Sequence, residues 1–180
     1  MAESGRSLRL FFALWPDAAT SSALHARARA LQTACGGRAM RRDTLHLTLA
    51  FLGETPASAV ARLQALATEV AGEGFTLELD RAGSWHRHRI LWTAASRVPS
   101  ALVALAQDLE GRLRATGIEI EERAFSPHVT LVRNAHAAPI EPELAPLRWT
   151  VASFVLVASE RIAAGACYRT IGRWRLKHRG

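Results

Sequence analysis

The segment Leu45–Leu49 (LHLTL) recurs almost unchanged as Pro127–Leu131 (PHVTL) in the second half of a chain of 180 residues. Both copies contain a histidine, an apolar residue, a threonine and a leucine in that order. Successive side chains of a β-strand point to opposite faces, so the histidine and the threonine of each copy share one face. The apolar residues share the other face, where they can pack into a core. The repeat therefore predicts two strands that each present an imidazole and a hydroxyl on the same side.

An approximate two-fold axis between the two halves would place His46 and Thr48 opposite His128 and Thr130 across a groove. An unperturbed histidine has a pKa near 6.5, so one imidazole can be neutral while the other is protonated near neutral pH. The two rings then supply a general base and a general acid on opposite sides of a reacting centre. The threonine hydroxyls can donate hydrogen bonds to an oxyanion. This set of groups suits in-line displacement at phosphorus without a covalent nucleophile or a metal.

The remaining histidines and cysteines show no pattern of metal ligands. A zinc site needs a third and a fourth ligand, and Cys35 and Cys167 stand in no ligand-like spacing to either motif. His86 and His88 alternate near a predicted turn, where we expect solvated side chains. We therefore predict no metal and no cofactor.

Strands and helices alternate along the chain without long linkers. Apolar and aromatic density predicts strands at Leu8–Leu14, Thr44–Leu52, Phe75–Asp80, Arg89–Ala94, Ile118–Ile120, Pro127–Arg133, Trp149–Ser159 and Tyr168–Leu176. Apolar spacing predicts helices at Ala18–Thr33, Pro56–Ala71 and Pro99–Thr116, with a turn at Gly83-Ser84 and a loop at Asn134–Pro146. This order is typical of an α+β protein, and we expect residues 1–180 to form a single bilobal domain with one His-x-Thr motif per lobe.

Composition and charge restrict the class of protein. The chain is 49% hydrophobic, and no apolar run approaches the ~18–20 residues of a membrane span. Two cysteines are too few for a disulfide scaffold, which predicts a reducing, cytoplasmic setting. The net charge of +7 is compatible with a polyanionic partner. Because Lys177 is the only lysine among 23 basic residues, the arginine excess can equally reflect the base composition of the coding DNA.

The chain resembles the two-histidine (2H) phosphoesterases, and within them the bacterial and archaeal RNA 2′,3′-cyclic phosphodiesterases, historically called 2′-5′ RNA ligases. The resemblance rests first on the segments Leu45–Gly53 and Phe125–Arg133, which are similar to the two signature segments of the family. Leu10–Leu14 with Pro16 resembles the opening strand of the family. Gly165–Tyr168, followed by Trp174 and Leu176, resembles its closing strand. The likeness covers nearly the whole chain.

The resemblance implies a bilobal α+β fold, with two mainly antiparallel sheets around a central groove and helices outside. It also implies hydrolysis of a terminal 2′,3′-cyclic phosphate on RNA to a 2′-phosphomonoester. Carried over by motif, His46 would be the general acid and His128 the general base. Thr48 and Thr130 would hold phosphate oxygens, and Arg133 would help to neutralise the phosphate.

The position of Arg133 conflicts with simple alternation. Counting from His128, residues 130 and 132 share the catalytic face and residue 133 lies on the opposite face. We therefore expect a bend or bulge after Leu131, or an approach from the end of the strand.

Other residues are weaker candidates. Arg41 and Arg42 precede the first motif and are candidates for contacting an RNA backbone. Phe11 or Phe12 could stack a terminal base, although a place in the core is at least as compatible with the sequence.

The expected partners are RNA ends or small cyclic nucleotide phosphates, with no membrane and no obligate protein partner, so that the protein would be a monomer. One alternative is a related 2H phosphodiesterase or 2′-5′ RNA ligase that acts on another small or 2′-5′-linked nucleotide. A more distant alternative is a non-catalytic RNA-binding module.

Overall fold

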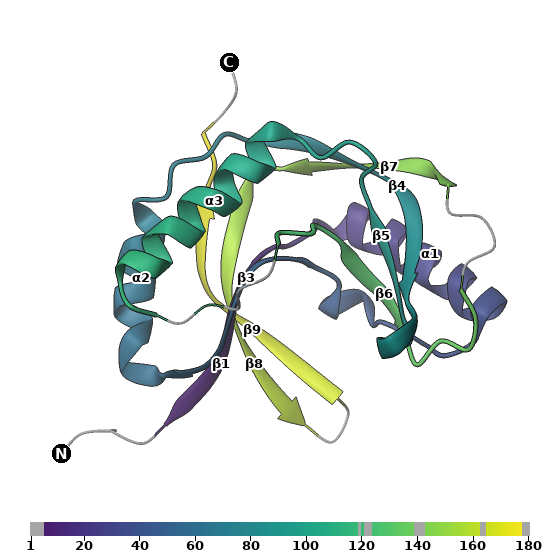
Figure 1. Ribbon diagram of the computed structural model, residues 1–180, viewed down its shortest axis with the longest axis horizontal. Coiled ribbons are helices and arrows are strands. Elements are labelled where there is room, and N and C mark those ends of the chain that lie inside the picture. The colour runs from purple at the N-terminus through teal and green to yellow at the C-terminus, as the bar shows by residue number, and fades with distance from the viewer. Residues whose placement is uncertain (1–5, 119, 121–123, 139–142, 163–164, 178–180) are drawn as a thin grey trace.

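The computed structural model describes residues 6–118, 120, 124–138, 143–162 and 165–177. Its strands are β1 (Ser7–Leu14), β2 (Arg38–Ala39), β3 (Leu47–Pro56), β4 (Phe75–Trp85), β5 (Ile90–Ala94), β6 (Val129–Arg133), β7 (Glu143–Val151), β8 (Ser153–Ile162) and β9 (Gly165–Arg175). Its α-helices are α1 (Ala18–Cys35), α2 (Val60–Thr68) and α3 (Ser100–Ala115), and short 3₁₀ helices lie at Arg42–Thr44, Ala57–Ala59 and His86–His88. Figure 1 shows their arrangement. Within the described residues, no helix is both long and apolar enough to cross a membrane.

The described strands form one antiparallel sheet in the order β7-β4-β5-β6-β3-β1-β8-β9, and β2 pairs with β6. β3 and β6, the strands that carry the two motifs, are joined at a single residue pair, Leu47 opposite Val129. In Figure 1, β1, β3, β8 and β9 lie on one side of this seam and β5 and β6 on the other. The two expected sheets are therefore the two halves of one continuous sheet.

Each half of the sheet carries its own helices, as expected. Helix α1 packs against β6 and β7, whereas α2 contacts β9 and α3 contacts β3. Helix α1 begins where Asp17 accepts a hydrogen bond from the Thr20 N–H at 2.7 Å, and it ends at Gly36 with φ of 72°. The predicted start and end of this helix are confirmed to within two residues.

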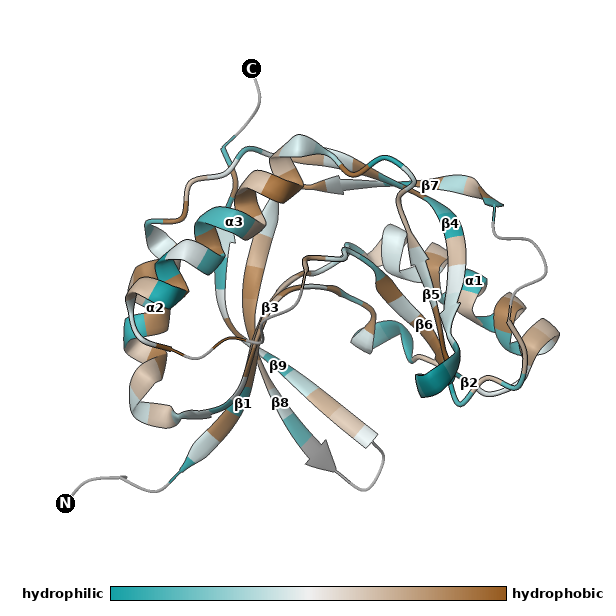
Figure 2. Ribbon diagram, in the orientation of Figure 1, coloured by the Kyte–Doolittle hydropathy of each residue, from teal (hydrophilic) through white to brown (hydrophobic). Residues whose placement is uncertain are grey.

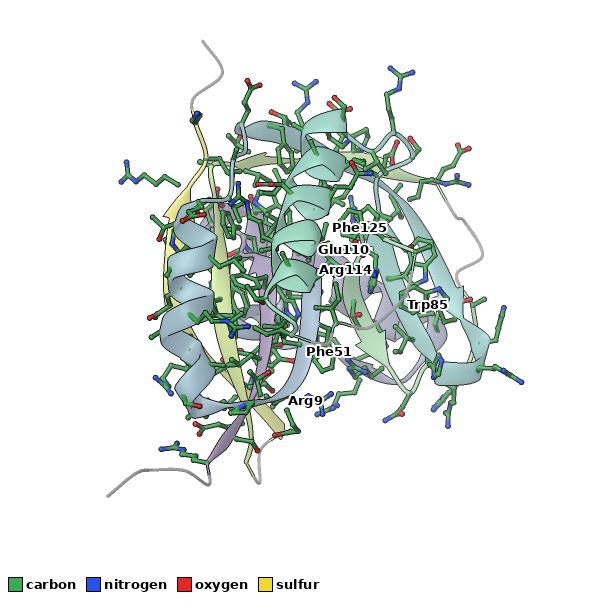
Figure 3. All side chains as sticks on the ribbon, turned by 60° about the vertical axis from the view of Figure 1, so that its left-hand side comes forward. Arg9, Phe51, Trp85, Glu110, Arg114 and Phe125 are labelled. Carbon is green, nitrogen blue, oxygen red and sulfur yellow. The ribbon has the colours of Figure 1, made fainter. Side chains whose placement is uncertain are left out.

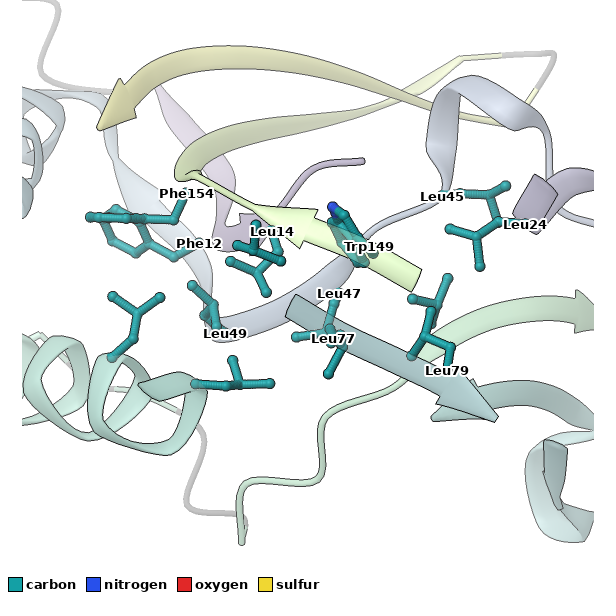
Figure 4. Close-up of a cluster of buried hydrophobic side chains, with 14 of the residues drawn as sticks. Phe12, Leu14, Leu24, Leu45, Leu47, Leu49, Leu77, Leu79, Trp149 and Phe154 are labelled. Carbon is teal, nitrogen blue, oxygen red and sulfur yellow. The ribbon is translucent and has the colours of Figure 1, made fainter. Parts of the chain in front are cut away.

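The hydrophobic core extends through both halves. Figure 2 shows hydrophobic residues along β3 and β6, and Figure 4 shows a cluster of buried side chains from both halves of the sheet. Fully buried members include Phe12, Leu14, Leu47, Leu77 and Trp149. The apolar face of α3 is also buried: Leu102, Leu105, Ala106, Leu109 and Leu113. Burial of such side chains stabilises each by about 1.5–3 kcal/mol relative to exposure.

The turn predicted at Gly83-Ser84 is wrong. Strand β4 continues through Gly83, and the chain reverses at His86–His88 instead. Gly83 lies opposite Trp92 on β5, and a Cβ atom at this glycine would lie 2.1 Å from the indole ring. The glycine is thus required for the close approach of an aromatic ring and not for a turn. His86 and His88 are exposed, as expected of turn residues.

Several other element boundaries differ from those predicted. The strand predicted at Thr44–Leu52 begins at Leu47 and continues through Gly53 to Pro56, and the helix after it is confined to Val60–Thr68. Ile118 and Ile120 belong to no strand, and residue 119 lies outside the described residues.

The C-terminal part of the chain also differs. The predicted strand Trp149–Ser159 is the end of β7 and the start of β8, separated at Ala152. The loop predicted at Asn134–Pro146 ends earlier, because β7 begins at Glu143. Pro146 is tolerated there because β7 is an edge strand of the sheet.

Candidate active site

The two motif histidines occupy equivalent positions at the seam of the sheet. His46 directly precedes β3 and His128 directly precedes β6. The Nδ1 atom of His46 lies 2.8 Å from the carbonyl oxygen of Thr44, and that of His128 lies 2.7 Å from the carbonyl oxygen of Ser126. A carbonyl oxygen only accepts hydrogen bonds, so Nδ1 carries a proton in both rings. The Nε2 atom of each ring is therefore the one that can exchange a proton with a ligand.

All five side chains proposed from the sequence line a single pocket of about 280 Å³. They are His46, Thr48, His128, Thr130 and Arg133. The other lining residues are Arg9, Phe11, Met40, Thr44, Phe51, Trp85, Ile90, Ser159 and Tyr168. Two imidazoles, two hydroxyls and two guanidinium groups thus surround a space in which a phosphate group would meet donors and no carboxylate.

The first motif contains a β-bulge at its leucine. The β1–β3 ladder pairs Ala13 with Thr48 and Phe12 with Ala50, so that Leu49 lies opposite no residue of β1. A bulge of this kind reverses the faces to which the following side chains point.

The second motif contains the same irregularity. The β5–β6 ladder pairs Trp92 with Thr130 and Leu91 with Val132, so that Leu131 lies opposite no residue of β5. Leu131 and Val132 are consecutive residues of a strand, yet both are completely buried. The two motifs are therefore alike in local backbone structure as well as in sequence.

The bulges resolve the position of Arg133. As the third residue after Thr130, Arg133 lies beyond the bulge and lines the pocket together with its motif. The bend or bulge expected after Leu131 is thus present. The equivalent residue of the first motif is Phe51, which also lines the pocket and lies 4.9 Å from the guanidinium carbon of Arg9 (Figure 3). The two equivalent bulges thus place Arg133 from one half and Phe51 from the other half in the lining of the same pocket.

Comparison with known proteins gives the family. A sequence model described as the 2′-5′ RNA ligase superfamily matches residues 18–163. The chain belongs to the 2′-5′ RNA ligase superfamily. The resemblance to 2H phosphoesterases that the two motifs carry is thereby confirmed.

Among superfamily relatives, the RNA 2′,3′-cyclic phosphodiesterase of Escherichia coli K12 is 38% identical over 170 residues, which cover 93% of this chain and 96% of that protein. The RNA 2′,3′-cyclic phosphodiesterase of Thermus thermophilus is 29% identical over 181 residues, covering 94% of this chain and 91% of that protein. The crystal structure of E. coli LigT complexed with 3′-AMP matches with a TM-score of 0.87 and 35% identity, over 95% of this chain and 99% of that one. The α+β fold predicted from the sequence is confirmed by this likeness.

The two histidines of this superfamily member differ in their surroundings. The His46 ring is enclosed by three aromatic rings, with centroid distances of 4.8 Å to Phe11, 5.3 Å to Trp15 and 5.3 Å to Tyr168. His128 is contacted by Trp85 alone among the described aromatic residues, edge to face at 4.4 Å. The imidazole of His46 is therefore the more completely shielded from water.

Burial lowers the pKa of both imidazoles. Desolvation lowers the pKa of His46 to about 4, against the opposing effect of the Thr44 carbonyl, and the nearby His128 and Arg133 lower it further. The pKa of His128 is also lowered, first by desolvation and then by Arg133. Both rings are thus neutral at pH 7 in the free protein, and both become easier to protonate when an anion enters the pocket.

The weaker candidates have different positions. Phe12 is completely buried and offers no surface to a base, whereas Phe11 lines the pocket but is only 3% exposed and packs against the His46 ring. Arg41 forms a two-point ion pair with Asp43 outside this pocket. Arg42 donates a hydrogen bond to the hydroxyl of Ser22 and does not line this pocket.

Sequence reasoning missed three aromatic residues that shape the site, namely Trp15, Trp85 and Tyr168. Tyr168 lies in a segment that carries the family resemblance, which was the available signal for it. Trp15 and Trp85 stand in no motif, and only the fold brings them to the histidines. In the described part of the chain, no group of three or more His, Cys, Asp or Glu side chains is arranged so that it could hold a metal ion.

Proposed function

We propose that this protein hydrolyses a 2′,3′-cyclic phosphate at the end of an RNA to a 2′-phosphomonoester. The observation that carries the proposal is the pair of imidazoles with tethered Nδ1 atoms in one pocket with two threonine hydroxyls and Arg133. The curated names of the E. coli and T. thermophilus relatives support the same reaction.

His128 acts as the general base and His46 as the general acid. The Nε2 atom of His128 takes a proton from water while the water oxygen bonds to phosphorus. The bond between phosphorus and O3′ breaks, and the Nε2 atom of His46 gives its proton to O3′. The product has a phosphate on O2′ and a free 3′-hydroxyl. The acid and the base each contribute about 10²–10⁴-fold to the rate.

Thr48, Thr130 and Arg133 hold the non-bridging oxygens of the phosphate. The hydrogen bonds that they donate become stronger as negative charge develops on these oxygens in the transition state. The guanidinium of Arg133 can form two parallel hydrogen bonds to such a group. Because His46 is neutral at pH 7 in the free protein, its proton must be stabilised by the anionic substrate. Proton loading of the acid is thus coupled to substrate binding.

The name of the 2′-5′ RNA ligase superfamily suggests a second reaction at the same site, the joining of two RNA ends. If a 5′-hydroxyl of another RNA replaces water, its oxygen attacks phosphorus, O3′ leaves, and a 2′-5′ phosphodiester results. The groups that transfer protons are the same in the two reactions. Hydrolysis prevails in water because water is in large excess over RNA ends.

The proposal is tested with purified protein and a panel of RNAs in a buffer that contains EDTA. The panel comprises an RNA with a 2′,3′-cyclic phosphate, a 2′-5′-linked RNA and a 3′-5′-linked RNA with a free 3′-hydroxyl. We expect the cyclic end to react fastest of the three RNAs and to give a product that alkaline phosphatase can dephosphorylate. If the 2′-5′-linked RNA is cleaved while the cyclic phosphate of the first RNA stays intact, the proposal is wrong and the protein is a related 2H phosphodiesterase with another substrate. Tight, salt-dependent binding without turnover would indicate an RNA-binding module.

A further inference from the structure

A second cavity, of about 500 Å³, adjoins the active-site pocket. The two share part of their lining, including Arg9, Arg133 and Tyr168. Arg38 and Arg41 line only the second cavity, beside the start of β9 at Gly165. Of the described residues that line this cavity, four are arginine and none is aspartate or glutamate. We call it the arginine cavity.

Two of these arginines lie directly opposite each other in the sheet. Arg38 on β2 is the register partner of Arg133 on β6. Like charges in this relation destabilise a sheet, because the side chains of opposed residues are close neighbours. Among the described residues, neither guanidinium has a hydrogen-bond acceptor or an ion-pair partner. The two arginines therefore repel each other in the folded protein, and a bound anion would relieve this repulsion.

The other two arginines are held in place by the protein. The side chain of Arg41 is fixed by Asp43 and by a hydrogen bond of 3.3 Å to the carbonyl oxygen of Ala166. Arg9 lies over the ring of Phe51. Two guanidinium groups of this cavity are thus anchored, and two have no partner among the described residues. Such a cavity has the chemistry of a phosphate site, because arginine binds phosphate through planar, charge-assisted hydrogen bonds.

The connection to the active site identifies which phosphate this is. Arg133 lines both spaces, so an anion in the arginine cavity lies next to one held between the histidines. Tyr168 also lines both spaces, and its ring contacts the ring of His46. If His46 protonates the departing O3′, the ribose of the terminal nucleotide lies near Tyr168, and the 5′-oxygen of that ribose carries the next phosphate of the chain.

We infer that the arginine cavity binds the phosphate on the 5′-oxygen of the terminal nucleotide, which in RNA is the phosphodiester to the preceding nucleotide. This inference rests on the proposed function. It makes the protein an enzyme for polynucleotide ends in preference to mononucleoside cyclic phosphates. Arg38 and Arg41 are the residues that distinguish the two substrate classes.

The test compares four substrates: a nucleoside 2′,3′-cyclic phosphate, its 5′-phosphorylated form, a dinucleotide with a terminal cyclic phosphate, and that dinucleotide with an uncharged methylphosphonate linkage. We expect kcat/KM to be about tenfold higher or more for the two substrates with a charged 5′-phosphate group, the value of one charge-assisted contact. Equal values for the phosphodiester and the methylphosphonate would overturn the inference. So would a gain for the dinucleotide that the 5′-phosphorylated nucleoside lacks, because it would indicate a contact to the second nucleoside.

Variants assign the effect to the cavity. In Arg38→Ala, the ratio of kcat/KM for the dinucleotide to kcat/KM for the nucleoside should fall about tenfold. The salt dependence of log kcat/KM for the dinucleotide should become shallower by about 0.7, the value for one phosphate of a single strand. Arg29→Ala removes the same charge from an exposed position on α1 that lines neither cavity, and its ratio should equal that of the wild type.

The outcomes separate the two proposals. An unchanged ratio in Arg38→Ala, with cyclic phosphates still hydrolysed, refutes the arginine cavity as a subsite and leaves the proposed function intact. Absence of hydrolysis of every cyclic phosphate by the wild type refutes both. Arg41→Ala is the second variant, because it changes the same cavity from a residue outside the sheet and keeps the test valid if Arg38→Ala alters β2.

Discussion

The indole of Trp15 lies parallel to the imidazole of His46, with ring centroids 5.3 Å apart and planes at 3°. An apolar ring in this position takes the place of water that would solvate a charged imidazole. This cover is one physical reason why the pKa of His46 falls to about 4. We expect Trp15→Leu to admit water and to raise the pKa of His46 by about one unit or more, measured by NMR titration of the ring protons. Tyr168→Phe, which keeps its ring, is the matched control, and an unchanged pKa in Trp15→Leu would show that the shielding comes from elsewhere.

Removal of either histidine should abolish turnover. We expect His46→Ala and His128→Ala each to lower kcat at least about 100-fold, because each removes one proton-transfer group. Thermal unfolding should show that both variants remain folded. His88→Ala, in the exposed turn after β4, should retain wild-type activity. Activity above one tenth of the wild type in either motif variant would contradict the paired acid–base mechanism.

Stability should fall as the pH is lowered from 6.5 towards 4. The folded-state pKa of both histidines is below the unfolded value of about 6.5, so the unfolded chain binds more protons in this window. The contribution of these histidines to the free energy of unfolding is therefore fully present above pH 6.5 and is lost as the pH falls. His46 alone should account for a loss of about 2–3 kcal/mol at pH 4.5. Thermal unfolding at pH 7 and pH 4.5 measures the effect. The decrease should be smaller in His46→Gln than in the wild type. An equal decrease in the two proteins would contradict the lowered pKa of His46.

Arg133 should affect both substrate binding and the two pKa values. Arg133→Ala removes a charge-assisted contact to the phosphate, and we expect kcat/KM to fall about 10–100-fold. The same change should raise the pKa of His46 and of His128, because Arg133 lowers both. Arg87→Ala, at an exposed turn position, is the control of equal charge. Unchanged pKa values together with a twofold effect or less on kcat/KM would remove Arg133 from the site.

Sulfur at the 3′-bridging position of the cyclic phosphate distinguishes acid from base. A thiolate leaves without protonation, so loss of the general acid should matter little with this substrate. We expect the sulfur substrate to restore His46→Ala to within about tenfold of wild type and to leave His128→Ala inactive. The opposite result would make His128 the acid and His46 the base.

The sequence contained most of the site because period-two alternation and the repeated motif are local signals. These signals were sufficient to predict that His46, Thr48, His128 and Thr130 face a common groove. The bulge at Leu131 could be anticipated only from the conflict over Arg133, and the matching bulge at Leu49 had no signal of its own. Its effect, the orientation of Phe51 into the pocket, depends on the pairing of β3 with β1.

Other features could not be predicted because they depend on contacts between distant segments. Gly83 has the appearance of a turn residue until Trp92 is known to lie opposite it. Pro146 suggests a loop until β7 is known to be an edge strand. Likewise, the opposition of Arg38 and Arg133 that defines the arginine cavity arises from the pairing of β2 with β6.

The most direct test of the paired-histidine hydrolysis is the position of the product phosphate. A short RNA that ends in a 2′,3′-cyclic phosphate is incubated with the wild type, His46→Ala or His128→Ala in EDTA, and the products are assigned by phosphorus NMR. We predict a 2′-phosphomonoester from the wild type and an unchanged cyclic phosphate with both variants. A 3′-phosphate product, or turnover that continues in either variant, would contradict the mechanism.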